Sequence, residues 1–76
     1  MLTNLQIQIL NFAKEQSFHG TLAEFISSKG VSEIEALSAL KDLKSKRIVS
    51  MPPDLLNSWI GVTNYGWKVM GWKRYV

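Results

Sequence analysis

The chain has 76 residues, of which 46% are apolar and 20% charged, and its net charge is +3 at pH 7. These values are typical of a single small globular domain, which we expect to cover residues 1–76, and they exclude a disordered tail. The sequence contains no cysteine, which excludes disulfides, thiolate metal sites and cysteine nucleophiles. Its one histidine, His19, has no visible nucleophile or metal-ligand partners, so we expect no enzyme activity, no metal and no cofactor.

The longest apolar run is far shorter than the roughly 20 residues that cross a bilayer. The first ten residues, MLTNLQIQIL, also lack the basic start of a signal peptide. We therefore expect a cytoplasmic protein without a membrane partner.

Charge is unevenly distributed along the chain. Residues 1–40 carry two basic and four acidic side chains, whereas residues 41–76 carry seven basic and two acidic ones. A basic half suggests a polyanionic partner, although a solvated face that keeps a small protein soluble gives the same pattern.

Apolar residues at helical spacing predict a first helix over residues 3–17, with Thr3 as its N-cap and His19-Gly20 at its end. The apolar stripe consists of Leu2, Leu5, Ile9, Phe12 and Ala13. Ile7 lies off this stripe, which predicts a side chain that is partly covered by another element or contacts another chain. For His19 we expect the role of a cap at the helix C-terminus.

A short second helix is predicted from a capping box, Thr21-x-x-Glu24, in which each side chain bonds the backbone N–H of the other residue. The helix ends at the glycine of the turn Lys29-Gly30-Val31. Its apolar face consists of Leu22, Phe25 and Ile26.

The third predicted helix follows this tight turn at once and extends from Ser32 to about Lys46. Ser32 is its N-cap, and Glu35 stands where it completes a second capping box. One side of the helix carries Ala36, Leu40, Leu43 and Arg47, with Leu37 flanking them. The opposite side, which we expect to be accessible, carries Ile34, Glu35, Ser38, Lys41, Asp42 and Ser45.

A β-hairpin over residues 48–63 is predicted next, because two strand-like segments, 48–51 and 58–63, flank a loop that contains Pro52-Pro53-Asp54. A final helix is predicted over 64–75, capped by Thr63 or Asn64. It contains two glycines, each of which weakens a helix by about 1 kcal/mol relative to alanine.

The aromatic residues gather near the C-terminus. Tyr65, Val69 and Trp72 share one stripe of the last helix, and we assign Trp59 and Trp72 to the core. Trp67 and Tyr75 do not both fit that stripe, so we expect one or both to be exposed and to form a self-association patch with Ile7.

Two helices joined by a tight glycine turn form a helix-turn-helix, here at 21–46, and a hairpin directly after it makes a winged helix. The expected fold is therefore mainly α with a small β-hairpin (α+β), in the order helix, helix, helix, strand, strand, helix. Three segments resemble those of MarR-like winged-helix transcriptional regulators: 21–26 with 30–32, 40–49, and 62–66.

This resemblance has two departures. Arg47 stands where the family usually has glycine, so its backbone must avoid or tolerate a left-handed conformation. The hairpin tip, 52–58, has no Lys or Arg, whereas family wings often insert a basic side chain into the minor groove.

The resemblance implies that helix 32–46 enters the major groove of duplex DNA. The implied base-edge residues are Ser32, Glu33, Ile34, Glu35 and Ser38, with Lys41 and Ser45 nearer the backbone. From their charge, the basic residues of the C-terminal half are the candidates for phosphate contacts: Lys41, Lys44, Lys46, Arg47, Lys68, Lys73 and Arg74. Ile34 can meet a thymine methyl group and Glu35 can accept from a cytosine amino group. Acids in the first helical turn also favour the helix dipole, which is the alternative interpretation of Glu33 and Glu35.

The function expected from these features is that of a duplex DNA-binding winged-helix protein, a small transcriptional regulator. The main alternative is a winged helix that binds a protein partner and no DNA, because the wing lacks bases and the third helix begins with two acids. A third option is a single-strand binder that uses the C-terminal aromatic residues.

Overall fold

The computed structural model describes residues 1–73, which form mostly helices and one two-stranded antiparallel hairpin in the order α-α-α-β-β-α. The first helix, α1, is Asn4–Glu15, and the predicted cap at its start is confirmed. Thr3 Oγ1 accepts from the Gln6 N–H at 3.1 Å, and the Thr3 N–H donates to Gln6 Oε1 at 3.0 Å.

The predicted end of this first helix was wrong. The helix stops at Glu15 because the next turn is left-handed, with φ of 53° at Ser17 and 63° at Phe18. Gly20 does not end the helix but allows a close approach, because a Cβ there would lie 2.9 Å from the Phe12 ring. Because Ser and Phe rarely adopt a left-handed backbone, these residue types do not predict that the helix ends before them.

The tight pair of helices forms as expected, with α2 at Leu22–Lys29 and α3 at Glu33–Ser45. The Thr21–Glu24 capping box is complete, and Gly30 ends α2 in a left-handed conformation with φ of 65°. At α3 only half of the expected box is present in the described structure, since Ser32 Oγ accepts from the Glu35 N–H at 3.4 Å without a reciprocal bond.

The hairpin is shorter than predicted. Strand β1, Val49–Ser50, pairs with β2, Gly61–Val62, and residues 51–60 form the connecting loop. The loop turns back towards the start of α2, where the Ala23 N–H donates to the Leu56 carbonyl at 3.0 Å. Just before β2 the chain pairs with the residues that precede α2, through an isolated bridge between Thr21 and Trp59. These long-range pairings replace part of the expected hairpin ladder.

The last helix, α4, is Asn64–Met70 with Thr63 as N-cap, and it ends at left-handed Gly71 rather than at residue 75. Its packing face is opposite to the predicted stripe, because Tyr65 and Val69 are exposed while Gly66 is buried. A Cβ on Gly66 would collide with the Ile48 carbonyl oxygen and lie 2.6 Å from Val62 Cγ1, so only glycine permits this contact with the hairpin.

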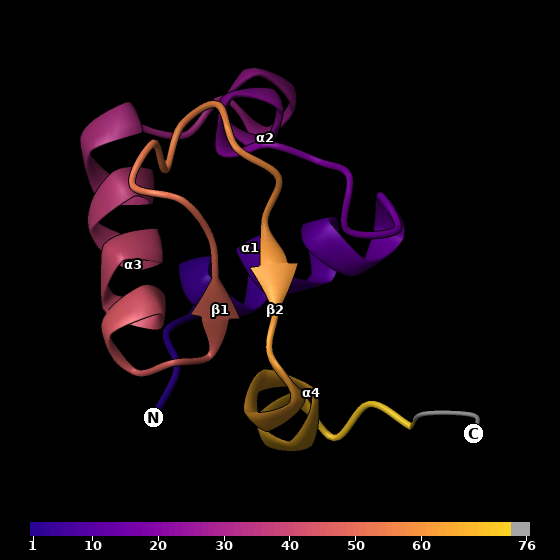
Figure 1. Ribbon diagram of the computed structural model, residues 1–76. Coiled ribbons are helices and arrows are strands. Elements are labelled where there is room, and N and C mark those ends of the chain that lie inside the picture. Colours follow the sequence, from indigo (N-terminus) through magenta and orange to yellow (C-terminus); the bar gives the residue numbers. More distant parts are fainter. Residues whose placement is uncertain (74–76) are drawn as a thin grey trace.

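Figure 1 shows how these elements surround one core. Helix α3 stands beside the hairpin, α2 lies at the top, α1 passes behind and α4 lies below β2. The fully or largely buried apolar residues are Ile9, Leu10, Phe12, Ala13, Leu22, Phe25, Ala36, Leu40, Leu43, Ile48, Val49, Met51 and Ile60. Leu10, which the predicted stripe of the first helix omitted, is fully buried.

One tryptophan prediction was wrong. Trp59, expected in the core, is 61% exposed, with its indole centroid 4.4 Å from that of the His19 imidazole. Trp67 is partly buried against Phe18 and Trp72, with ring centroids 5.6 and 5.3 Å away. Trp72 packs against the edge of the core as a partly buried residue.

Arg47 has a left-handed backbone, with φ of 61°, at the position where the sequence resemblance places glycine. A left-handed conformation costs a non-glycine residue about 1–2 kcal/mol, and the greater entropy of unfolded glycine offsets part of the gain from replacing it. We expect Arg47→Gly to raise the free energy of unfolding by about 0.5–1 kcal/mol, measured by urea denaturation. Arg47→Asn should give a smaller rise, and a loss of stability in both variants would contradict this account.

Candidate nucleic-acid interface

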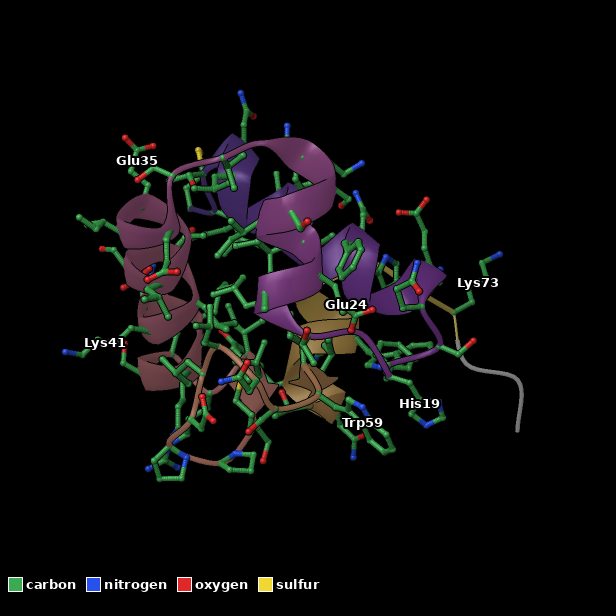
Figure 2. All side chains as sticks on the ribbon, turned by 90° about the horizontal axis from the view of Figure 1, so that it is seen from above. His19, Glu24, Glu35, Lys41, Trp59 and Lys73 are labelled. Atoms are coloured by element: carbon green, nitrogen blue, oxygen red, sulfur yellow. The ribbon has the colours of Figure 1, made fainter. Side chains whose placement is uncertain are left out.

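The outward side of α3 is exposed. Ala36, Leu40 and Leu43 fix the helix to the core through its inward side. The predicted outer residues Ile34, Glu35, Ser38, Lys41 and Ser45 are exposed, and Ile34 is 81% exposed. Figure 2 shows the side chains of Glu35 and Lys41 directed away from the body of the protein, on the side opposite to His19 and Trp59.

Two shallow grooves flank this ridge. The first lies between α3 and the start of α1 and is lined by Thr3, Leu5, Gln6, Ile34, Glu35, Ser38, Ala39 and Asp42. The second lies between α3 and the hairpin loop and is lined by Leu37, Ser38, Lys41, Pro53, Asp54, Leu55 and Leu56. Ser38 borders both grooves and therefore stands at the crest of the ridge.

The charges on α3 are divided along its length. Its first turn carries Glu33 and Glu35, whereas the second half and the turn after it carry Lys41, Lys44, Lys46 and Arg47. The acids lie at the positive end of the helix dipole and the bases at its negative end, so each group stabilises the helix whatever else it binds.

The three candidate serines differ in whether their hydroxyl groups already make hydrogen bonds within the protein. Ser32 Oγ is occupied by the Glu35 N–H, and Ser45 donates to the Asp42 carbonyl at 2.8 Å. The Ser38 hydroxyl makes no hydrogen bond to any described residue and Ser38 is exposed, so this hydroxyl is available to a ligand. Of the three, Ser38 is the best placed to contact a partner directly.

A polar contact that the sequence did not reveal joins α1 to α3. The Gln6 side chain is only 3% exposed, and its Nε2 donates to Asp42 Oδ2 at 2.8 Å and to the Ala39 carbonyl at 3.3 Å. The same Asp42 oxygen lies 2.9 Å from Lys46 Nζ. The hydrogen bonds from Lys46 and Gln6 lower the pKa of Asp42, so this carboxyl remains ionised at neutral pH.

No simple signal in the sequence identifies this contact. The sequence shows Gln6 only as the partner of Thr3 in a capping box. That box uses the backbone N–H and Oε1 of Gln6 and says nothing about its Nε2. Only the packing of α1 against α3 brings Gln6 to Asp42, which is 36 residues away in sequence.

The hairpin loop lies beside α3 and presents no base. Asp54 Oδ1 accepts from the Leu56 and Asn57 N–H groups at 3.2 and 3.1 Å, which folds the loop into a local turn. Pro52 and Pro53 are exposed on the same loop. Because the tip has no cations, phosphate contacts beside this loop require bases outside it, such as Lys41 of α3, which lines the same groove.

The predicted self-association residues differ in exposure where the structure describes them. Ile7 is 36% exposed on α1, whereas Trp67 packs against aromatic rings within the molecule. Tyr75 lies outside the described residues. The exposed apolar residues of α4 are instead Tyr65 and Val69, which the sequence had assigned to an inward stripe.

His19 has a different neighbour from the one expected. Helix α1 ends four residues before it, and the His19 ring lies tilted by 45° against exposed Trp59 instead of capping the helix. Both rings lie on the side of the molecule opposite to the outward side of α3 (Figure 2).

Within residues 1–73, no helix is long and apolar enough to cross a membrane, and no three His, Asp or Glu side chains gather as metal ligands would. Comparison of the chain with family models, curated proteins and solved structures gave no match.

Proposed function

We propose that the protein is a winged helix-turn-helix domain that binds duplex DNA, as a small transcriptional regulator of MarR-like type, with α3 in the major groove. The observation that carries this proposal is the free outward side of α3, whose inward side is fully buried. A helix anchored by one side and uncovered on the other has the shape that a major groove admits.

The arrangement around α3 supports the same interpretation. The α2–α3 pair is joined by a short glycine turn, and the hairpin follows α3 directly. The bridge between Thr21 and Trp59 adds the segment before α2 to the hairpin, which ties the helix pair to the wing. The loop of the wing borders the α3 ridge, so both can approach one duplex.

The proposed contacts divide between the two halves of α3. Ile34, Glu35 and Ser38 face the bases, where an apolar side chain suits a thymine methyl group and a carboxylate suits a cytosine amino group. Lys41, Lys44 and Arg47 face phosphates. Because Glu33 and Glu35 repel phosphates, we expect weak binding by one copy, so useful affinity requires two copies or a partner.

The test is titration of labelled random duplex at low and moderate salt. We expect binding that weakens steeply as salt rises, with a slope of log K against log salt of roughly −3 for the three proposed phosphate contacts. Lys41→Ala and Lys44→Ala should each weaken binding on every sequence and reduce the slope by about 1. Ser38→Ala should leave the slope unchanged and alter the sequence preference instead.

Two results would overturn the proposal. The first is no salt-sensitive binding at protein concentrations of about 100 µM, the weak limit for non-specific binding. The second is unaltered affinity and preference in all three variants. Lys14→Ala is the matched control, because Lys14 lies on α1 with its ammonium over the Trp72 ring at 4.9 Å, and it should change binding less than either α3 lysine.

One observation favours protein docking as a second candidate function. Ile34 is 81% exposed between Glu33 and Glu35, and it lines the groove that also contains Leu5 and Ala39. An apolar residue flanked by acids suits a basic, partly apolar protein segment better than it suits a phosphate backbone. Salt-insensitive binding of a protein partner that Ile34→Asp abolishes, together with no duplex binding, would favour this function.

A further inference from the structure

The carboxylate of Asp42 occupies an unusual place on the proposed DNA-binding helix. It is the one acid among the bases of the second half of α3 and the turn that follows. Its pairing with Lys46, at 2.9 Å, is the one ion pair among residues 1–73. Lys41, Lys44 and Arg47 therefore have no acidic partner in the described chain, and Lys46 alone is neutralised at rest.

Asp42 is held in place from the neighbouring helix. Gln6 Nε2 donates to Asp42 Oδ2 at 2.8 Å, and the rest of the Gln6 amide is fixed by Thr3 and by the Ala39 carbonyl. Because Gln6 is buried and all its bonds are made, it cannot rotate away without losing them. An exposed i, i+4 ion pair is ordinarily loose, but here its acidic member is positioned by a buried amide.

We propose that Asp42 is an electrostatic brake on DNA binding, which holds Lys46 back from phosphate and so keeps sequence-independent affinity low. This inference rests on the proposed function and assigns its regulation to one residue. A cation that must leave an ion pair before it reaches a phosphate contributes less to binding than a free one. When binding to any DNA sequence is weaker, a larger part of the affinity comes from the base-facing residues of α3. The protein then distinguishes its target sequence from other DNA more strongly.

The experiment compares four proteins on the same random duplex across a range of salt: the wild type, Asp42→Asn, Lys46→Ala and the double variant. Asparagine keeps an oxygen for Gln6 but removes the charge that holds Lys46. We expect Asp42→Asn to bind about 5- to 10-fold more tightly at low salt, with a salt slope steeper by about 1 because one more phosphate is neutralised.

The double variant shows whether Lys46 is the cause. Lys46→Ala should cost several times more affinity in the Asp42→Asn background than in the wild type, and should return the slope to the wild-type value. Glu15→Gln is the matched control, because it removes one acid from the far end of α1, and at a salt concentration of about 0.1 M its effect is screened over a Debye length of about 10 Å. Thermal melting of every variant checks that each remains folded.

The outcomes separate this inference from the function on which it rests. If the wild type and Asp42→Asn both bind no duplex, the proposed function fails and this inference fails with it. If the wild type binds but Asp42→Asn has the same slope, or Lys46→Ala costs the same in both backgrounds, DNA binding stands and the brake is overturned. An equal gain of affinity in Glu15→Gln shows that only total charge matters, which also overturns it.

Discussion

Leu40→Ala is expected to lower the free energy of unfolding by about 3 kcal/mol, within the range of about 2–5 kcal/mol found for buried leucines. Leu40 is fully buried on the inward side of α3, so truncation removes apolar contacts and leaves a cavity. A chain of this size has a total stability of about 4–11 kcal/mol, so the loss is a large fraction of it. Thermal melting should show a decrease in Tm of roughly 12–24 °C.

Lys41→Ala is the matched control, because Lys41 is the next residue on the same helix and points outward (Figure 2). Its stability should stay within about 0.5 kcal/mol of the wild type. The pair therefore separates the two sides of α3: one variant loses stability, and the other loses affinity for DNA. Similar unfolding free energies for both would show that the helix does not have a distinct inward side.

Gly66→Ala is expected to lower the free energy of unfolding by about 2 kcal/mol, although alanine is the better helix former by about 1 kcal/mol. The added methyl group would collide with the Ile48 carbonyl oxygen and with Val62, both part of or next to the hairpin. The steric cost exceeds the propensity gain because the nearest atom belongs to backbone that is fixed by pairing. Urea denaturation measures the difference, and the intrinsic tryptophan fluorescence reports on α4 through Trp67 and Trp72.

Gly71→Ala provides the comparison for this prediction. Gly71 has φ of 70°, and a Cβ there meets nothing within 4 Å, so its substitution costs only the left-handed strain of about 1 kcal/mol. A loss at residue 66 no larger than the loss at residue 71 would show that α4 can move away from the hairpin without penalty.

The local features of the fold were accessible from the sequence because each depends on residues three or four positions apart. The caps at Thr3, Thr21 and Thr63 and the glycine end of α2 are of this kind, as is the sidedness of α3. The element order α-α-α-β-β-α follows from the same local signals. The left-handed backbone at Arg47 is also a local feature, and it is one of the two conformations that the sequence left open for this residue.

The exposure of the candidate residues was predictable from the sequence, but their contacts with other elements were not. The outer residues of α3 follow from helical periodicity, and the structure exposes them as expected except for Asp42, which is partly covered by Gln6. The link from Gln6 to Asp42 and the two grooves require the packing of elements that are distant in sequence. No residue type or spacing marks a contact of that kind, because a buried glutamine and an exposed one look the same in a sequence.

The sequence by itself determined where the helices begin, their N-cap residues and which side of α3 is apolar, since backbone hydrogen bonding and side-chain periodicity act over a single turn. Tertiary structure decided which side of α4 faces the hairpin, since steric access at Gly66 outweighs the apolar character of Tyr65 and Val69. It also decided that Trp59 lies outside the core, since pairing to the segment before α2 fixes the backbone there and leaves the indole beside His19. In both places a contact between distant segments outweighed the hydrophobic preference of the residues themselves.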